Sequence, residues 1–341
     1  MFTGSDIGVD LGTANVLVFV RGKGIVLHEP SVVAMDKESG RVIAVGSEAR
    51  RMLGRTPGNI IALRPLRDGV IADYDVTEKM LRYFISKSDG GRKFFFRPRI
   101  MVCIPSGVTG VEERAVRQAA IQAGAKEAYL IEEPLAAALG AGLDISQPSG
   151  TMVIDIGGGT TDIAVLSLGG IVCSKSLRVG GDKIDEAIVK YIRREYSLAI
   201  GERTGEELKM EIGTADLKGA DDKSMEIRGR DMLSGLPKGV VVSRRQVHDA
   251  IKEVLDLIVS GVKEVLERTS PELAADIVNK GIILTGGGAL LDGMDRLLSR
   301  ETGLPIYVAD DPLSCVAKGT GRALNNMGII SAASRGKAVK R

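Results

Sequence analysis

An internal repeat of one glycine-rich strand unit constrains this chain more than any other feature. Residues 7–27 read IGVDLGTANVLVFVRGKGIVL, and residues 152–172 read MVIDIGGGTTDIAVLSLGGIV. Each copy has an apolar strand, an Asp, a Gly-rich turn with Thr, and two further apolar strands. Matching positions of Asp10 and Asp155 argue against a chance recurrence of β-hairpins. We therefore predict two similar domains, each opened by one copy of the unit.

Between and after the repeats, apolar residues recur at helical spacing. Helices are predicted at 111–124, 134–142, 182–196 (with Asp182 as N-cap), 243–268 (capped by Ser243) and 290–300, and short strands at 100–104 and 282–285. A third glycine turn, 286–288, follows the last of these strands. Alternating strands and helices in two halves predict an α/β fold with two duplicated lobes and a cleft between them.

More polar and less regular segments divide each lobe into a core and a small subdomain. We expect the core of lobe I to comprise 1–31, 69–145 and 315–341, with residues 32–68 as its small subdomain. The core of lobe II is expected at 146–182 and 243–314, with residues 183–242 as its small subdomain.

Composition excludes several classes of function. The 341 residues include 46 Lys and Arg against 44 Asp and Glu, a net charge of +2 that gives no global attraction for nucleic acid. Cysteines 103, 173 and 315 have neither metal-site nor disulfide spacing, which suits a reducing cytosol. The N-terminal residues lack a signal-peptide pattern, and no apolar run approaches the ~20 residues of a membrane span. We expect a cytoplasmic protein.

The two glycine turns suit phosphate groups. Gly-rich turns after a strand let backbone N–H groups approach phosphate oxygens. Thr13, Ala14 and Asn15 form one such loop, and Gly157, Gly158, Gly159 and Thr160 form the other. Neither loop is a Walker or dinucleotide-binding motif, since GxxxxGK[ST] and GxGxxG are absent from both. Two facing loops are expected to hold a pair of phosphates from both sides.

Asp10 and Asp155 each precede one of these loops at a strand end. Carboxylate and water oxygens next to phosphate are the ligands that Mg²⁺ prefers. Asp is also common as a turn-capping residue. Because the pair recurs in duplicated context, we favour binding of Mg²⁺, largely through water, over capping.

At this point a family resemblance is evident. DLGTAN at 10–15, DIGGGTTD at 155–162 and LTGGGALL at 284–291 resemble the two phosphate motifs and the adenosine motif of the actin, Hsp70 and sugar-kinase superfamily. Further stretches are similar to the bacterial actin homologues of the MreB family: EPSVVA at 29–34, RPLRDGVIADY at 64–74, IGERT at 200–204 and ADDPLSCVAKGTG at 309–321. The resemblance covers nearly the whole chain and implies an actin-like fold.

The resemblance also implies roles for individual residues. ATP with Mg²⁺ is the expected ligand, with the phosphates on the loops described above. Its adenosine is expected against Gly286, Gly287, Gly288 and Ala289, and against Glu206, Glu207, Leu208 and Lys209. The second of these segments has the alternative of an exposed helix face with favourable charge spacing. Gly180–Asp182 matches a helix start near the ribose, and capping is an equal alternative there.

For hydrolysis, the resemblance favours Glu133 as the residue that orients or deprotonates the attacking water, with Thr160 holding the same water. Glu132 is the adjacent alternative, and a carboxylate before Pro134 also suits a helix start. The implied protein is a slow ATPase whose hydrolysis is coupled to filament assembly. An Hsp70-like chaperone would need a further substrate-binding domain, and a small-molecule kinase would need an Asp base that we cannot nominate.

The family implies self-association into filaments, partners in cell-wall elongation, and a place at the cytoplasmic face of the cell membrane. Phe94, Phe95 and Phe96 are consecutive and flanked by Lys and Arg. Exposed aromatics ringed by cations suit an anionic lipid surface. Packing in the core is the alternative, but strand alternation leaves at least one of three consecutive rings outside. We expect Phe95 and Phe96, with Phe2 close by, to contact the membrane.

Overall fold

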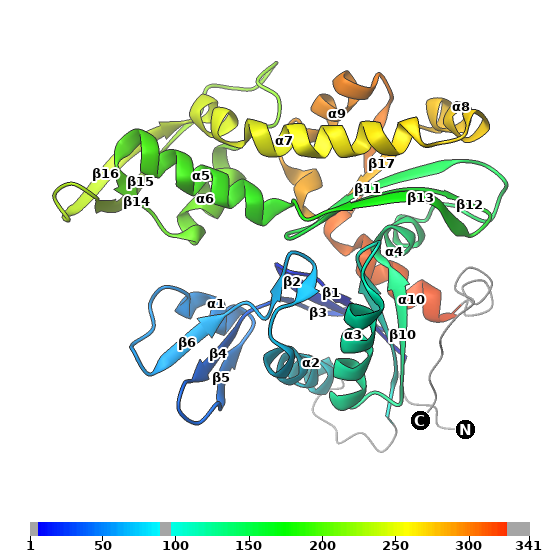
Figure 1. Ribbon diagram of the computed structural model, residues 1–341, viewed down its shortest axis with the longest axis horizontal. Helices are drawn as coiled ribbons and strands as arrows, with labels where there is room; N and C mark the ends of the chain where they lie inside the picture. Colours follow the sequence, from blue (N-terminus) through cyan, green and yellow to red (C-terminus); the bar gives the residue numbers. More distant parts are fainter. Residues whose placement is uncertain (1–5, 89–96, 326–341) are drawn as a thin grey trace.

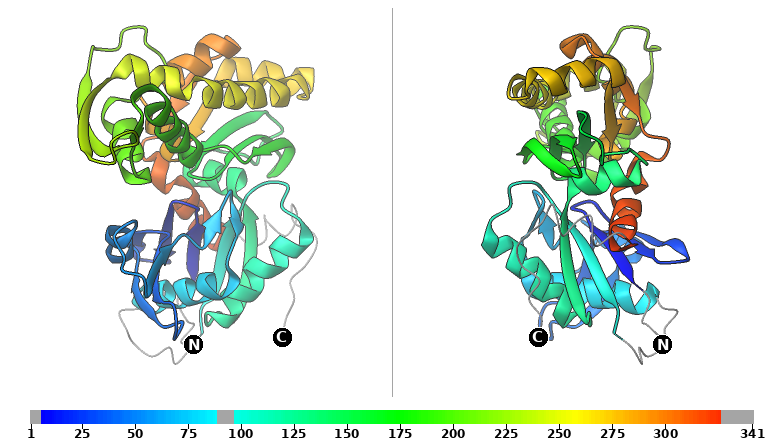
Figure 2. Two further views of the ribbon diagram at one scale, coloured as in Figure 1. Left: turned by 60° about the vertical axis from the view of Figure 1, so that its left-hand side comes forward. Right: turned by 90° about the vertical axis from the view of Figure 1, so that its right-hand side faces the viewer.

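The structure is a computed structural model that describes residues 6–88 and 97–325. Two five-stranded sheets form the frames of two lobes, which lie one above the other in Figures 1 and 2. The sheet of lobe I has the order β10-β9-β1-β2-β3, and that of lobe II has the order β13-β12-β11-β17-β18. Lobe I contributes β1 Ile7–Leu11, β2 Asn15–Val20, β3 Gly24–Pro30, β9 Arg99–Ile104 and β10 Glu127–Glu132. Lobe II contributes β11 Thr151–Ile156, β12 Thr161–Ser167, β13 Gly170–Leu177, β17 Ile282–Thr285 and β18 Ile306–Val308.

The two sheets have the same topology. In each, three consecutive strands form an antiparallel meander. The first strand of the meander also pairs in parallel with a later strand, which is β9 in lobe I and β17 in lobe II. That later strand pairs in parallel with a fifth strand, β10 or β18. Asp10 lies opposite Leu17, and Asp155 lies opposite Asp162, at the same register of the two meanders. The predicted duplication of an α/β lobe is confirmed, and it places both aspartates at equivalent strand ends.

Helices α4 Glu133–Gly140 and α10 Cys315–Asn325 pack on each other at the seam between the lobes. A Cβ on Gly140 would lie 1.7 Å from the Cys315 carbonyl oxygen, and one on Gly319 would lie 1.8 Å from the Ala136 carbonyl oxygen. Each helix therefore presents a glycine to the backbone of the other, and no larger residue fits without moving a helix. Helix α4 also contacts β11 and β12, and α10 contacts β1 and β2, so this pair of helices connects the two large sheets.

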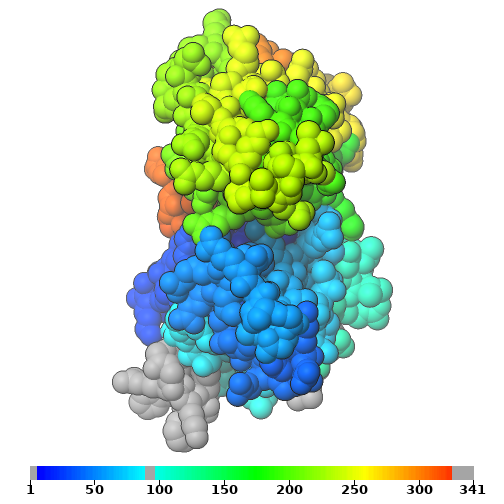
Figure 3. Space-filling model, turned by 90° about the vertical axis from the view of Figure 1, so that its left-hand side faces the viewer, coloured from blue at the N-terminus to red at the C-terminus, as the bar shows by residue number. Residues whose placement is uncertain are grey.

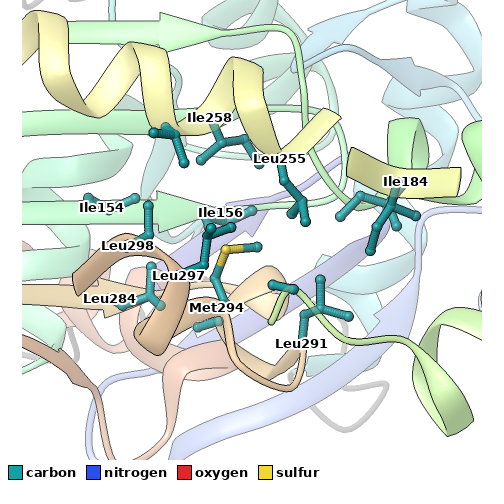
Figure 4. Close-up of a cluster of buried hydrophobic side chains, with 14 of the residues drawn as sticks. Ile154, Ile156, Ile184, Leu255, Ile258, Leu284, Leu291, Met294, Leu297 and Leu298 are labelled. Atoms are coloured by element: carbon teal, nitrogen blue, oxygen red, sulfur yellow. The ribbon is translucent and has the colours of Figure 1, made fainter. Parts of the chain in front are cut away.

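One hydrophobic cluster joins the large sheet of lobe II to helices of its core and of its small subdomain: α5 Gly181–Tyr196, α6 Glu202–Ile212, α7 Arg244–Glu267, α8 Pro271–Lys280 and α9 Met294–Thr302. Helix α7 is the long helix expected from the sequence, and Ser243 caps it by accepting the Gln246 N–H. Leu255 and Ile258 of this helix point into the cluster drawn in Figure 4, where they meet side chains of the sheet and of α9. Removal of this apolar surface from water stabilises the lobe.

Each lobe carries a smaller sheet at the left of Figure 1. In lobe I it comprises β4 Val33–Asp36, β5 Val42–Val45 and β6 Ile60–Leu63, with helix α1 Ser47–Met52 beside it. In lobe II it comprises β14 Leu198–Ala199, β15 Ser224–Asp231 and β16 Pro237–Ser243. The remaining elements are the hairpin β7 Leu66–Arg67 and β8 Val70–Ile71, helices α2 Tyr74–Ser88 and α3 Gly110–Gln122, and the 3₁₀ turns η1 Gly287–Leu290 and η2 Pro312–Ser314.

Three expectations about local structure are wrong. Beyond the predicted helix, the part of 183–242 expected to be less regular forms helix α6 and the paired strands β15 and β16, because Leu208, Ile212, Ile227 and Val242 are buried in one hydrophobic cluster. Helix α5 takes Gly180, not Asp182, as its N-cap. The helix expected at 290–300 starts only at Met294, because Gly293 has a φ of 74°, in the left-handed region, and interrupts it.

Candidate functional site

A cleft of about 900 Å³ lies between the lobes and is lined by residues of both. Figure 3 shows the side of the molecule on which the small subdomains of the two lobes face each other. The structure brings most of the predicted site residues to its wall: Asp10, Thr13, Ala14, Asn15, Glu133, Asp155, Gly157, Gly158, Gly159, Thr160, Glu206, Lys209, Gly286, Gly287 and Gly288. Segments separated by more than two hundred residues in sequence thus meet at one cavity.

Three predicted residues do not line the cleft. Leu208 is buried in the core of lobe II, and Ala289 packs against the same core. Glu207 instead accepts a 2.9 Å bond from Arg203 one turn away on α6. Their neighbours Glu206, Lys209 and Gly288 line the cleft, as expected for a helix that turns only part of its surface to the cavity.

The first loop connects β1 to β2 and is held by hydrogen bonds from Ser31 and from the β7–β8 hairpin. The Ser31 hydroxyl donates to the Gly12 carbonyl at 2.5 Å, and the Ser31 N–H donates to the Ala14 carbonyl at 2.9 Å. The Gly69 N–H of the β7–β8 hairpin donates to Thr13 Oγ1 at 3.1 Å. These bonds hold the loop through its carbonyl and hydroxyl oxygens. The N–H groups of Thr13 and Ala14, in contrast, make no hydrogen bond within the described residues.

The second loop connects β11 to β12 and is held by the start of α5. The Gly181 N–H donates to the Gly157 carbonyl at 2.9 Å, and the Asp182 N–H donates to the Gly158 carbonyl at 2.8 Å. Across residues 6–88 and 97–325, no acceptor is found for the N–H groups of Gly158 and Gly159. Backbone N–H groups of a tight turn that lack a protein acceptor form an anion-binding concavity.

The two loops approach each other too closely for side chains. A Cβ on Gly158 would lie 2.6 Å from Ala14 Cβ, and a Cβ on Gly159 would lie 2.4 Å from Thr13 Oγ1. Glycine is therefore required at both positions by space rather than by backbone angle. The closeness brings two sets of N–H donors, one from each lobe, to the same part of the cleft.

Carboxylates cluster at the floor of the cleft, where Asp155 is buried and Asp10 is half-buried. Burial raises the pKa of Asp10 to about 7, although the Cys103 thiol that donates to its Oδ1 at 3.2 Å opposes this. Burial also raises the pKa of Asp155 to about 6, opposed by the Thr285 hydroxyl that donates to its Oδ1 at 2.7 Å. Neither aspartate has a Lys or Arg partner among the described residues. Uncompensated buried negative charge of this kind suits a divalent cation.

Glu133 and Glu132 have different surroundings. Glu133 is buried at the start of α4 and lines the cleft, and burial, followed by the charges of Asp162, Asp155 and Asp10, raises its pKa well above the usual range. Glu132 is not part of the cleft wall and accepts the Ser106 hydroxyl at 2.7 Å. Of the two neighbours, only Glu133 can meet a molecule in the cleft.

Asp162 is a buried carboxylate that sequence reasoning did not single out. Its Oδ1 accepts the Ser106 N–H at 2.7 Å, and its Oδ2 is buried without a hydrogen-bond partner in the described chain. Burial raises its pKa to about 7. The signal was present in DIGGGTTD, where this Asp occupies the position of Leu17 in the first repeat.

Side chains of the cleft wall also connect separate elements of the fold. Lys209 donates to Asp185 Oδ2 at 2.9 Å and to the Gly181 carbonyl at 3.2 Å, which joins α6 to the start of α5. Arg50 of α1 forms an ion pair with Glu206 of α6 and so connects the lobes across the cleft. The lining includes other polar side chains that the sequence did not single out: Asp221, Lys223, Arg244, Asp292 and Arg296.

The described residues contain no group of three or more His, Cys, Asp or Glu side chains arranged to hold a metal ion. They also contain no helix that is both long and apolar enough to cross a membrane. The expected membrane residues Phe2, Phe95 and Phe96 lie outside the described residues.

Comparisons with known proteins agree with this architecture. Residues 4–332 match the family described as MreB/Mbl protein. The cell shape-determining protein Mbl of Bacillus subtilis is 57% identical over 94% of this chain and 96% of its own length. The cell shape-determining protein MreB of Escherichia coli is 53% identical over 94% of this chain and 93% of its own.

Solved structures give the same result. MreB 5 of Spiroplasma citri bound to AMPPNP has a TM-score of 0.90 at 41% identity and covers 96% of this chain and 98% of its own. The double helical filament of MamK has a TM-score of 0.81 at 22% identity, covering 94% of this chain and 99% of its own, a likeness of fold.

Proposed function

The chain belongs to the MreB/Mbl family and has its actin-like fold, and from this we propose that it binds and hydrolyses ATP, assembles into filaments and directs rod cell shape through cell-wall elongation. Relatives that are called cell shape-determining proteins cover nearly the whole chain. The Spiroplasma structures bound to AMPPNP and to ADP support an adenine nucleotide as the ligand.

The observation that carries the proposal is the pair of facing loops. Gly158 and Gly159 from lobe II meet Ala14 and Thr13 from lobe I, and N–H groups on both sides lack protein acceptors in the described residues. We propose that the phosphates bind between Thr13–Asn15 and Gly157–Thr160. The adenosine would lie along Gly286–Gly288 and the face of α6 that carries Glu206 and Lys209. Leu208 and Ala289 would support this wall from behind, where they pack in the hydrophobic core of lobe II. Glu207 would act only through its ion pair with Arg203 on α6.

Asp10 and Asp155 would hold Mg²⁺, largely through water. Their burial without a basic partner fits a cation at this place. When bound, the cation supplies positive charge to the phosphates and to these carboxylates. Glu133 would orient the attacking water and accept its proton, and Thr160 would hold the same water with its hydroxyl, because both line the cleft beside the second loop.

We further propose that the lobes divide into four subdomains. The cores are 1–31 with 69–145 and 315–341, and 146–182 with 243–314; the small subdomains are 32–68 and 183–242. The small sheets and the large sheets of Figure 1 support this division. Relative movement of two lobes joined at the α4–α10 seam would open and close the cleft, which links nucleotide state to assembly.

Sedimentation tests the function. With ATP and Mg²⁺ the protein is expected to pellet as polymer, and with EDTA it should remain in the supernatant. An ATPase of the chaperone or sugar-kinase type would hydrolyse ATP and stay in the supernatant under both conditions. Absence of ATP binding in calorimetry would overturn the proposal altogether.

The filament is proposed to lie on the cytoplasmic face of the cell membrane through Phe95, Phe96 and Phe2. Many weak insertions on one polymer add by avidity. The double variant Phe95→Ser with Phe96→Ser should lose co-sedimentation with anionic liposomes and keep ATP binding. Leu233→Ser is the matched control, because Leu233 is 87% exposed in the distant β15–β16 connection. Equal liposome binding by the double variant and the control would disprove the membrane role.

A further inference from the structure

Each of the two floor aspartates is held by a donor at the same place in the duplicated fold. Strand β9 lies parallel beside β1, and β17 lies parallel beside β11. The register of the second pair sets Thr285 beside Asp155, and the register of the first, continued by one residue, sets Cys103 beside Asp10. The equivalent position of the neighbouring strand therefore supplies a thiol in lobe I and a hydroxyl in lobe II.

In lobe II the hydroxyl has one proton and two acceptors within reach. Thr285 Oγ1 lies 2.7 Å from Asp155 Oδ1 and 3.4 Å from the Ile154 carbonyl oxygen. The shorter contact receives the proton, since O–H···O bonds have their optimum near 2.7 Å. Thr285 is fully buried, so no water competes for this bond. One oxygen of Asp155 is thereby fixed, and its carboxylate is oriented toward the cleft that it lines.

In lobe I the thiol performs the same role more weakly. Cys103 Sγ donates to Asp10 Oδ1 at 3.2 Å, and Cys103 is buried on β9. An S–H group is a poorer donor than a hydroxyl. Asp10 is therefore held by a weaker hydrogen bond than Asp155, although the two carboxylates occupy equivalent strand ends.

We propose that Thr285 and Cys103 are a matched pair of positioning residues, which orient Asp155 and Asp10 for the hydrated divalent cation of the bound nucleotide. The inference rests on the proposed nucleotide site and deepens it. Neither residue lines the cleft. Each fixes one oxygen of a carboxylate and leaves the other oxygen without a protein donor in the described part of the chain.

The test for lobe II is Thr285→Val, which keeps the shape and removes the donor. Calorimetric titrations with ADP at a series of Mg²⁺ concentrations give the Mg²⁺ concentration that half-saturates the Mg²⁺-dependent gain in affinity. We expect that concentration to rise about tenfold, because a hydrogen bond to a charged group is lost. ADP affinity in EDTA should stay at the wild-type value, and Thr285→Ser should restore the Mg²⁺ dependence.

For lobe I, Cys103→Ala should raise the same Mg²⁺ concentration only about threefold, since the lost donor is weaker. Swapping the type of donor between the two lobes gives a sharper test than removing it. Cys103→Ser, with a better donor, should need less Mg²⁺ than wild type, and Thr285→Cys should need more. Thr285→Cys also serves if Thr285→Val does not fold.

The outcomes separate this inference from the function on which it rests. If wild type binds ADP with Mg²⁺ and Thr285→Val shows the same Mg²⁺ dependence, the positioning role is wrong. Weakening of ADP binding to the same extent with and without Mg²⁺ would also overturn it, because that marks a general structural defect. If wild-type protein binds no ADP at all, the proposed function fails and this inference falls with it.

Discussion

Lobes I and II share one strand unit but differ in what they place at its second strand. Opposite Asp10 lies the buried apolar Leu17, whereas opposite Asp155 lies the buried carboxylate of Asp162. The glycine turns and the two aspartates are common to both lobes. The duplication thus gives the two lobes equivalent loops and aspartates. The residues that differ between the lobes, such as Leu17 and Asp162, determine where a further carboxylate is buried.

The seam between the lobes shows the same contrast. Residues 132–135 read EEPL at the start of α4, and residues 310–313 read DDPL just before α10. Glu133 is buried against three other carboxylates, which raises its pKa. Asp311 in the second copy is half exposed and pairs with Lys318 at 2.7 Å, and that bond lowers its pKa. One motif therefore gives a cleft carboxylate in lobe I and a surface ion pair in lobe II.

The largest expected effect comes from removal of the cleft carboxylate. Glu133→Gln should slow ATP hydrolysis on the order of 10²-fold, as for loss of a positioned acid–base group, and leave ATP binding intact. Asp311→Asn is the matched control from the other lobe and should hydrolyse ATP at nearly the wild-type rate. Single-turnover phosphate release measures both. Equal rates for the two variants would remove the distinction between the lobes at this motif.

The next effect concerns the seam itself. Gly319→Ala places a methyl group 1.8 Å from the Ala136 carbonyl oxygen, so α4 and α10 must separate. Overpacking of this kind is expected to lower the free energy of unfolding by about 2 kcal/mol. Urea denaturation measures it. Gly110→Ala on α3 is the control, because a Cβ there meets nothing within 4 Å. If both variants are equally stable, the seam does not depend on glycine.

A smaller effect concerns the pH dependence of stability, because lobe II has the buried carboxylate of Asp162 where lobe I has Leu17. The pKa of Asp162 is about 7 in the folded protein against an ordinary value of 3.8, so the folded state keeps a proton that the unfolded chain releases. The resulting stability is complete below the ordinary value and is lost as pH rises through about 7. The free energy of unfolding without nucleotide should therefore fall between about pH 5 and 7 and level off above that.

Asp162→Asn should reduce that fall, since Asn carries no titrating proton. The surface residue Asp144 has a lowered pKa because of its bonds to Ser146, so Asp144→Asn should leave the slope in this range unchanged. Urea denaturation at a series of pH values compares the variants. A slope in Asp162→Asn as steep as in wild type would assign the effect to Asp10, Asp155 or Glu133 instead.

The sequence was sufficient for features that are encoded locally. The glycine turns, the strand-end aspartates and the duplicated fold follow from short motifs whose geometry depends on adjacent residues. The cap of α7 by Ser243 is another example, since its partner Gln246 lies three residues away.

Contacts between segments far apart in the sequence could not be predicted from such local motifs. Arg50 meets Glu206, and Ser106 meets Asp162, only because the fold brings separate elements together. Nothing in the sequence around Arg50 distinguishes it from its neighbour Arg51. The same limit explains why Leu208 and Ala289 were assigned to the cleft wall, although their side chains turn to the core of lobe II.

The smallest effect is expected where the two small subdomains meet. Arg50 and Glu206 form the ion pair across the cleft with side chains 40% and 24% exposed, so water and salt weaken it. Arg50→Gln should speed release of fluorescent ADP about two- to threefold at low salt, consistent with the modest energy of exposed pairs. Arg51→Gln is the control, since Arg51 is exposed and has no ion pair in the described structure. Raised salt should bring wild type toward the Arg50 variant. Identical release by all three proteins at low salt would show that the lobes are held closed elsewhere, at the contact of the two loops and the α4–α10 seam.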